Sequence, residues 1–386
     1  MTVTNQQTRR ESFVDRKRYL YALSILWPLV PVIGIGLALE TGWGIFFGFT
    51  IFLWYVIISG VDALLPEDES NPPDGAMERL EGDRYYRVLA YLTVPVHYVT
   101  LLVSAWAVAT LPMAWWEVLL LALSVGIANG LAINTGHELG HKPASLDRWM
   151  AKIVLAVVGY GHFLIEHNRG HHRDVATPDD LASARFGENI YSFSLREIPG
   201  GIMRSWRHEA ERLTRRGKSV WSLENEVLQP LLITVVLYGA LISYFGLVIV
   251  PFMAIQMAFG WWQLTSANFV EHYGLLRLKG PDGRYERCRP EHSWNSNRVF
   301  SNLILFHLQR HSDHHANPVR SYQCLRNFDG LPTLPGGYPM MFFVSYFPPL
   351  WRALMDERVI ANVNGDMTKV NVDPAWASRH GLAKAA

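Results

Sequence analysis

The chain has few cysteines: Cys288 and Cys324 are the only two among its 386 residues. Two isolated cysteines exclude a disulfide framework and a four-cysteine iron–sulfur cluster. The sequence also has no glycine-rich dinucleotide fingerprint and no haem-attachment motif. Any redox chemistry therefore needs bound metal ions and a separate protein as electron donor.

Lysine and arginine are absent from six long apolar runs. Only 18% of the residues are charged, 49% are hydrophobic, and the net charge of +1 gives no argument for nucleic-acid binding. Each run has roughly 20 residues, enough to cross a hydrocarbon core of about 30 Å. We predict membrane spans at residues 19–39, 43–65, 88–111, 115–136, 227–245 and 247–270. A seventh run, 153–165, is too short to span, and we expect a helix buried against the bundle or lying at the interface.

The turns after the first, third and fifth spans also lack lysine and arginine. The positive-inside rule then places both termini and the long polar segments in the cytoplasm. The predicted fold is an all-α integral membrane protein with six transmembrane helices and a cytoplasmic, histidine-rich di-metal cap. Its segments are an N-terminal tail, spans one to four, a first histidine segment, spans five and six, and a C-terminal histidine segment: 1–18, 19–136, 137–226, 227–270 and 271–386.

Nine of the 15 histidines form four clusters just outside the apolar runs. Histidine is the commonest metal ligand, and residues i and i+4 share one face of a helix. Nine ligands are too many for one ion and suit two ions with open positions. The pairs His137/His141, His167/His171 and His311/His315 have the i, i+4 spacing, and we expect each ion to keep at least one such pair. The predicted metal ligands are His137, His141, His167, His171, His172, His272, His311, His314 and His315.

The other histidines are isolated, except His307, which helical spacing would place on the face of His311. Metal-bound histidines usually donate their other N–H to a carboxylate or a carbonyl. We therefore predict that the acidic residues flanking the clusters form an outer layer around the ligands. These residues are Glu138, Glu166, Asp174, Glu271 and Asp313.

Residues 137–141 also match H-E-x-x-H, the zinc-protease motif with Glu138 as the base. An intramembrane zinc protease would use three ligands, His137, His141 and one more, and would leave six clustered histidines without a role. A desaturase or another membrane hydroxylase is a closer alternative. The donor type alone does not name the metal, because imidazole binds zinc, copper, iron and nickel.

The histidine motifs and most of the chain resemble the integral-membrane alkane 1-monooxygenases. This family belongs to a wider histidine-box group with membrane desaturases and xylene monooxygenases. The resemblance rests on residues 134–142 (NTGHELGHK), 166–178 (EHNRGHHRDVATP), 268–277 (NFVEHYGLLR) and 308–316 (LQRHSDHHA). The third motif separates alkane hydroxylases from desaturases. Phe269 stands where the family usually has Tyr, and Asp180-Leu181 where it usually has Asp-Pro; we expect neither departure to touch a ligand.

The resemblance implies two non-haem iron ions, O2 as co-substrate, and terminal hydroxylation of medium-chain n-alkanes to 1-alkanols. It implies electrons from a rubredoxin with its NAD(P)H-dependent reductase, in a bacterial inner membrane. In the family a bulky residue on the second span limits chain length, and Trp54 holds that position; Ile133 and Leu264 would line the cavity near the metals.

We expect five arginines to crowd near the metal clusters on the cytoplasmic face. A small acidic redox protein could dock on them, or they could contact lipid headgroups as positive-inside residues often do. They are Arg169, Arg173, Arg207, Arg215 and Arg216.

Overall fold

The computed structural model describes residues 13–381, so the predicted N-terminal tail is seen only from Phe13 onward and residues 382–386 are also outside the description. Within this range the chain is helical, and β structure is limited to isolated bridges such as Leu275 with Val370. The predicted all-α class is confirmed.

Six helical segments are long and apolar enough to cross a membrane, which confirms the six predicted spans. They are Leu20–Thr41, Gly44–Leu64, Arg84–Thr110, Trp115–Gly140, Leu228–Phe245 and Leu247–His272. The bounds agree to within a few residues. The fourth and sixth spans continue past their predicted ends at 136 and 270, and this extension places His137 and His272 on the span helices themselves.

The first two spans are built from short helical pieces, and the first contains Pro28 and Pro31. The first contains η1 (Leu20–Ala22), α2 (Leu23–Leu26), η2 (Trp27–Leu29) and α3 (Val30–Thr41). The second contains η3 (Gly44–Gly48), α4 (Phe49–Phe52), a π-helical segment η4 (Leu53–Ile58) and α5 (Ser59–Leu64). The third, fourth and fifth spans are α7 (Arg84–Thr110), α8 (Trp115–Gly140) and α13 (Leu228–Phe245), and the sixth is η7 (Leu247–Ile249) with α14 (Val250–His272).

Helices α8 and α14 pack closely through small residues. A Cβ atom added at Gly130 would lie 2.9 Å from the Gln263 side chain, and one at Gly126 would lie 2.8 Å from Cβ of Phe259. Small residues that let backbones approach in this way are typical of membrane helix pairs. Because both contacts advance in the same direction along the two helices, α8 and α14 run parallel, and both end at the histidine-rich side.

Residues 153–165 do not form the single helix that we predicted. Helix α9 (Ser145–Leu155) and the 3-10 turn η5 (Ala156–Val158) end at Gly159, whose φ of +62° lies in the left-handed region. A new helical stretch starts with α10 (Phe163–Ile165). Glycine adopts positive φ at little cost, so it breaks the helix. The expected burial against the bundle does hold for most of this segment.

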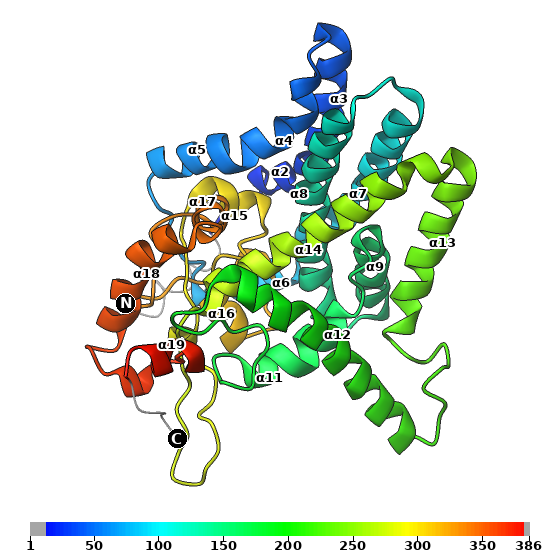
Figure 1. Cartoon of the computed structure of the whole chain (residues 1–386). Helices are drawn as coiled ribbons and strands as arrows, with labels where there is room; N and C mark the ends of the chain where they lie inside the picture. Colours follow the sequence, from blue (N-terminus) through cyan, green and yellow to red (C-terminus); the bar gives the residue numbers. More distant parts are fainter. Residues whose placement is uncertain (1–12, 382–386) are drawn as a thin grey trace.

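The polar segments form a cap at one end of the spans (Figure 1). Helix α6 (Asp74–Gly82) follows the second span. The first histidine segment holds η6 (Glu166–His171), α11 (His172–Asp174) and α12 (Ile190–Arg215). The C-terminal segment holds η8 (Pro290–His292), α15 (Val299–Ile304), α16 (His311–Ala316), η9 (Tyr322–Cys324), α17 (Tyr338–Ser345), α18 (Pro348–Asn362), η10 (Met367–Lys369) and α19 (Pro374–Arg379).

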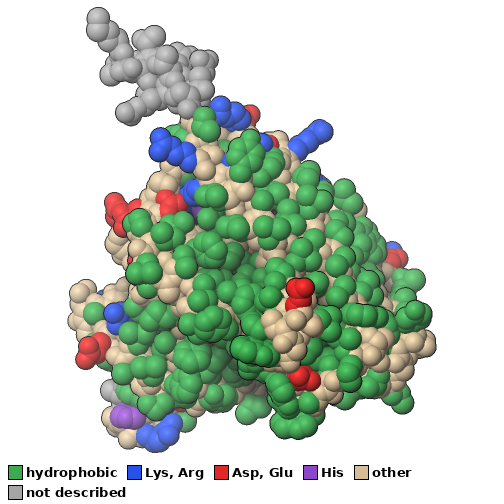
Figure 2. Space-filling view, turned by 90° about the horizontal axis from the view of Figure 1, so that it is seen from above, with side chains coloured by type: hydrophobic (Ala, Val, Ile, Leu, Met, Phe, Trp, Pro, Cys, Tyr) green, Lys and Arg blue, Asp and Glu red, His purple; other side chains and the backbone are tan. Residues whose placement is uncertain are grey.

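The surface of the spans is apolar. Large hydrophobic side chains such as Val235, Val236 and Leu247 are more than half exposed. Figure 2 shows hydrophobic side chains over much of the face seen from above, with Lys and Arg at its margins. Such a surface suits helices that face lipid acyl chains rather than water.

Candidate metal centre

The nine predicted ligands come together in two groups at the end of α8 and α14. The five-histidine group contains His137, His141, His167, His172 and His314. The four-histidine group contains His171, His272, His311 and His315. In each group every residue offers one ligand atom within 4.8 Å of all the others. The groups are neighbours, since the ring centroids of His172 and His315 lie 4.5 Å apart.

The five-histidine group has ring nitrogens that face one another. Nε2 of His314 lies 2.9 Å from Nε2 of His137 and 3.1 Å from Nε2 of His172, and Nε2 of His167 lies 3.1 Å from that of His141. A neutral imidazole carries one N–H and one lone pair. A set of nitrogens all pointing inward cannot satisfy itself with hydrogen bonds alone, whereas one cation at the centre satisfies all of them. The donor set therefore fits a metal ion.

Burial keeps these imidazoles neutral. It lowers the pKa of His141, His167, His172 and His314 well below the usual value, and mutual repulsion among the histidines lowers it further. Only the neutral ring has the lone pair that binds a metal. The group is thus poised to bind a cation at neutral pH.

The four-histidine group is oriented by hydrogen bonds on the outer side of its rings. Nδ1 of His272 donates to the backbone oxygen of His292 at 3.0 Å. Since a carbonyl oxygen can only accept, Nδ1 carries the proton and Nε2 presents its lone pair. That Nε2 is buried and has no hydrogen-bond partner within residues 13–381. A buried Nε2 lone pair without a hydrogen-bond partner is suited to bind a metal ion.

A π-helical turn decides how the second cluster divides. We expected His167 and His171 to share a helix face, but they belong to different groups. Residues 166–171 form the π-helix η6, in which backbone hydrogen bonds join residues i and i+5. His167 consequently pairs with His172, with 3.0 Å between their Nε2 atoms, and His171 turns to His315 at 3.2 Å. Each group still keeps one i, i+4 pair, as predicted: His137 with His141, and His311 with His315.

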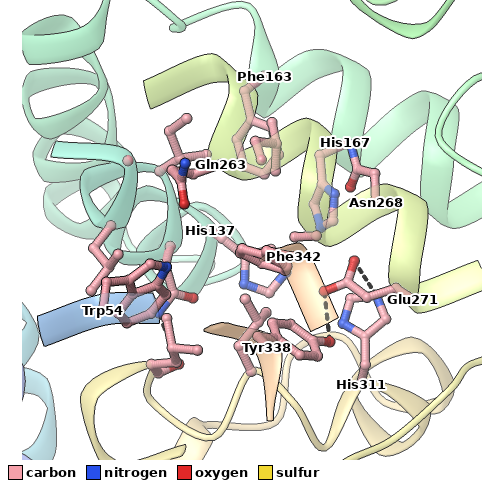
Figure 3. Close-up of a pocket in the computed structure, with 18 residues that line it drawn as sticks. Trp54, His137, Phe163, His167, Gln263, Asn268, Glu271, His311, Tyr338 and Phe342 are labelled. Carbon is pink, nitrogen blue, oxygen red and sulfur yellow. Dashed lines mark hydrogen bonds and ion pairs between the residues drawn. The ribbon is translucent and has the colours of Figure 1, made fainter. Parts of the chain in front are cut away.

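An apolar cavity adjoins both groups and encloses about 570 Å³ between side chains. Trp54, Ile133 and Leu264, the predicted substrate residues, all line it, and so do His137, His167 and His311. Figure 3 shows Trp54 at the opposite end of the cavity from Glu271 and His311. The structure therefore places the indole at one end of an apolar chamber and metal-binding side chains at the other.

The comparisons with known proteins agree with this geometry. The fatty acid desaturase family matches residues 113–344, which include all nine histidines. An alkane 1-monooxygenase of Alcanivorax borkumensis is 64% identical over 364 residues, covering 94% of this chain and 90% of the relative. One from Pseudomonas putida is 61% identical over 368 residues, covering 95% and 92%.

This chain belongs to the alkane 1-monooxygenase family. The resemblance seen in the histidine motifs is thereby confirmed, and so is the expectation that the chain is an oxidoreductase. The hydroxylase component of a xylene/toluene monooxygenase from Pseudomonas putida is more distant, at 30% identity over 240 residues, 60% of this chain and 62% of the relative. The family leaves the zinc-protease interpretation of residues 137–141 without support.

Four of the five carboxylates that we expected around the ligands pair with basic side chains instead. Glu138 pairs with Lys142 at 3.0 Å, and Glu166 and Asp174 pair with Arg204. Asp313 pairs with Arg320. Among residues 13–381 none of these four has an ion pair or hydrogen bond to a ligand imidazole. The cause is local: each has a basic side chain within reach, and an arginine or lysine competes for the carboxylate.

Glu271 is the one of the five that meets a ligand. Its Oε2 lies 3.3 Å from Nε2 of His311, and its Oε1 accepts a hydrogen bond of 2.8 Å from the Tyr338 hydroxyl. Because Nε2 is also the nitrogen that His311 turns toward His315, at 2.8 Å, Glu271 lies beside the four-histidine group rather than behind it. Its carboxylate supplies negative charge that nine neutral imidazoles lack.

Asp180 is the outer-layer residue that the sequence reasoning missed. It directly precedes Leu181, the residue that departs from the family pattern, and its Oδ2 lies 2.8 Å from Nδ1 of His171. Burial works to raise the pKa of Asp180, but the charges of His171 and Arg204 outweigh burial and hold that pKa well below its usual value. The residue is therefore a carboxylate that fixes the His171 ring with Nε2 inward. Phe269, the other departure, packs among Phe193, Tyr273 and Trp351.

We expect Asp180→Asn to weaken metal retention by about 10- to 100-fold, because an amide orients the His171 ring less firmly and adds no charge. Glu138→Gln, at a carboxylate that binds Lys142 instead, is the matched control and should retain metal as the unaltered protein does. The measurement is metal content per chain after dialysis against a graded chelator. Equal metal retention in the two variants, or a larger loss in Glu138→Gln, would contradict the assignment of Asp180 rather than Glu138 to the outer layer.

The remaining histidines stay away from both groups. His307, which helical spacing would have placed on the face of His311, has φ of +53°, and its Nε2 lies 3.0 Å from the Tyr21 hydroxyl. His97 contacts Asn129, and the Nδ1 of His292 accepts the backbone N–H of Arg289. His307 illustrates why spacing alone does not assign a ligand: the chain between residues 305 and 310 is a turn rather than a helix.

The five arginines do not form one patch. Arg204, between them in sequence, bonds Glu166 and Asp174 and so anchors the middle of α12 beside the histidines. Arg173 is exposed next to this point, and Arg207 is exposed three residues further along α12. Arg169 is held by Glu209 and Glu226. Arg215 and Arg216 lie 11 and 12 residues beyond Arg204, roughly 17 Å along the helix axis.

Proposed function

We propose that this protein hydroxylates the terminal carbon of medium-chain n-alkanes to 1-alkanols, with O2 as oxidant, at two iron ions. The five-histidine group would hold one iron and the four-histidine group the other. The observation that carries the proposal is the arrangement of both groups at one end of an apolar cavity in a chain of this family. A desaturase or a hydroxylase of another substrate is the alternative.

The cavity suits a substrate without polar groups. Its wall consists mainly of apolar and aromatic side chains, including Leu131, Phe163 and Phe342. Burying a CH2 group from water contributes about 0.8 kcal/mol, but an alkane arriving from lipid is already in apolar surroundings. Selection must therefore come from the length and shape of the cavity. The wall histidines His137, His167 and His311 bring the chain end against the metal-binding groups.

Bound iron supplies the activation of O2 that an unactivated C–H bond requires. The side chains do the rest: the apolar wall excludes water from the substrate, and the hydrogen bonds of Asp180 and the His292 carbonyl fix two imidazoles. Glu271, held by Tyr338, adds negative charge next to the four-histidine group. The imidazole donors do not select iron over copper or zinc by affinity, so metal identity requires measurement.

The test is metal analysis of the purified protein together with the product formed from one n-alkane and ¹⁸O2. Two irons per chain and a 1-alkanol that carries ¹⁸O are expected. A single zinc per chain with no oxygenated product would support the protease alternative. An alkene, or a product hydroxylated inside the chain, would favour a desaturase or a different hydroxylase.

We further propose that the electrons come from a rubredoxin that docks near the metal centre on the cytoplasmic side. The two cysteines, Cys288 and Cys324, are free and far too few to hold a redox cluster. Arg173 and Arg207 are exposed near the point where Arg204 of α12 pairs with Glu166 and Asp174. These two arginines are the favoured contacts. The basic residues between the spans support the cytoplasmic orientation in an inner membrane.

Turnover driven by rubredoxin should fall as salt rises, because the screening length shortens to about 8 Å at physiological ionic strength. Arg173→Glu and Arg207→Glu should raise the KM for rubredoxin and flatten this salt dependence. Arg216→Glu, at the far end of α12, is the matched control and should leave both unchanged. If turnover is the same at low and high salt, or if all three variants behave alike, the arginines contact headgroups instead.

A further inference from the structure

A second cavity lies against the metal-binding histidines and differs in character from the first. It encloses about 320 Å³ between side chains, and its wall contains Glu166, Glu197, His167 and His171. The two cavities share wall residues, among them His167, Leu264 and Asn268. The first cavity has a mainly apolar wall with one carboxyl group, Glu271, whereas the smaller second cavity has two, Glu166 and Glu197.

Glu197 is a buried carboxyl group that the metal centre does not use. It lies on α12, is only 5% exposed, and is one of two acidic side chains in the wall of the second cavity. Thr265 donates to its Oε2 at 2.8 Å, and the Asn268 amide donates to its Oε1 at 3.0 Å. Because a hydroxyl can both donate and accept, the contact with Thr265 remains satisfied when Glu197 carries a proton.

No cation pairs directly with Glu197 in the part of the chain that the structure describes. The charged and titratable groups around it are Glu166, Arg196 and Tyr160, together with His167 and His171 in the wall of the same cavity. Arg196 bonds Glu188 instead. Burial raises the pKa of Glu197 to about 7, against the lowering effect of the Thr265 and Asn268 hydrogen bonds. An unpaired buried acid that can exist in either protonation state near neutral pH suits proton transfer.

The second cavity also has a polar route toward solvent. Glu166 packs against Gly201, one helical turn after Glu197 on α12, so both carboxyl groups face the same space. Arg204 bonds Glu166 and reaches Asp174, whose neighbour Arg173 is exposed. The polar wall and the size of the second cavity let it hold at least one water molecule.

A monooxygenase consumes protons that must reach a buried site. The balanced reaction is R–CH3 + O2 + 2 e⁻ + 2 H⁺ → R–CH2OH + H2O, with the electrons from a one-electron donor protein and both protons from solvent. The product water must also leave. The apolar cavity holds the substrate, and its mainly apolar wall is poorly suited to carry protons or water. A separate polar entrance would keep the path of protons and water apart from the path of the alkane.

We propose that the second cavity is the water and proton entrance of the hydroxylation site, and that Glu197 holds the proton and passes it to water in that cavity. In each transfer the O–H bond of Glu197 breaks as the proton moves to cavity water, and a proton taken up from solvent through that water restores the bond. The inference rests on the proposed hydroxylation at the nine histidines. Glu197 acts through water and does not bind the metal.

The experiment compares Glu197→Gln, which keeps the shape and loses the acidic proton, with Glu197→Asp, which restores an acid. A buried carboxylic acid gives an infrared C=O band that shifts in D2O. The iron-loaded protein should show such a band below neutral pH, and Glu197→Gln should lack it. With iron content unchanged, Glu197→Gln should lower turnover by about 10²-fold and raise the solvent isotope effect, and Glu197→Asp should recover part of the turnover.

The pH dependence has a definite sign. Since Glu197 donates when protonated, turnover limited by proton delivery should fall as the pH rises through about 7, and Glu197→Gln should lose this inflection. Glu209→Gln removes another buried carboxyl of α12, three turns away, and serves as the matched control: its isotope effect should equal that of the unaltered protein.

The proposal is overturned if the iron-loaded protein lacks the exchangeable carboxyl band, or if Glu197→Gln retains turnover, isotope effect and pH profile. Loss of iron in both Glu197 variants would also overturn it, since Glu197 would then be a structural residue. If the unaltered protein forms no alkanol, the proposed hydroxylation is wrong. The infrared band still shows, independently of turnover, whether Glu197 is protonated.

Discussion

His315→Ala should remove most of the bound iron and abolish alkane hydroxylation, while the six spans still insert into the membrane. His315 has the most central position of the four-histidine group: its Nε2 lies 2.8 Å from that of His311 and 3.2 Å from that of His171. Its ring also approaches His172 of the other group. Removing it leaves three inward imidazoles and a gap in which water can compete for the metal, and the effect reaches both ions.

His171→Ala should have a similar effect, because it removes the ligand that Asp180 orients. The matched control is His307→Gln, which alters a buried histidine in the same segment as His311 but keeps a hydrogen-bonding group for Tyr21. Iron per chain is measured on protein extracted from the membrane, with a protease-accessibility assay for correct insertion. Full activity and normal iron in either alanine variant would exclude that histidine as a ligand.

The membrane architecture could be predicted almost completely from the sequence. Hydropathy and the placement of lysine and arginine are properties of contiguous residues, so six spans follow from the sequence without knowledge of packing. The prediction was wrong in detail where one residue changes the backbone direction. Gly159 divides residues 153–165, because its left-handed conformation ends a helix that the apolar pattern alone would continue.

The convergence of the nine histidines could be predicted from the sequence, but their division into two groups could not. Clustered histidines identify a metal site because imidazoles rarely crowd for any other reason. The division into groups of five and four depends on the π-helical turn at 166–171, and no residue pattern in that segment distinguishes i+5 from i+4 bonding. His171 and His172 are adjacent in the chain and yet face different groups.

The outer layer was the least predictable part, because carboxylates were chosen for nearness in sequence. Asp180 lies nine residues after His171 and returns to it through a turn that includes a hydrogen bond from Ser183 to the same carboxylate. Glu138, directly beside His137, faces Lys142 instead. The position of Asp180 before a departure from the family pattern was a usable signal, but only the fold shows which side chain its carboxylate meets.

The length of alkane that the enzyme accepts should be set by Trp54. The residue is fully buried, begins a π-helical segment of the second span, and lines the apolar cavity. The ring of Trp27 lies behind it, with 5.1 Å between centroids, so the indole cannot easily swing aside. A π-helical segment moves side chains out of the regular helical positions, which places this indole at the end of the cavity.

Trp54→Ser should extend the accepted range to longer alkanes, with oxidation still at the terminal carbon. A serine removes most of the side-chain volume at the end of the cavity away from the metal-binding histidines, so the additional methylenes are accommodated there and the reacting methyl keeps its place. Rates on alkanes just beyond the original limit should rise by about tenfold or more, the usual scale of discrimination per methylene. The measurement is a product profile over a series of alkane lengths at equal enzyme iron content.

Ile133→Ala provides the matched comparison, because Ile133 also lines the cavity but lies one turn before His137, near the metal-binding end. Enlarging the cavity there widens it beside the reacting carbon and leaves its length unchanged. We therefore expect Ile133→Ala to keep the upper limit and to relax the choice of oxidised carbon, the opposite of the Trp54→Ser result. An unchanged upper limit in Trp54→Ser would show that the indole only packs against Trp27, and that another wall residue measures the chain.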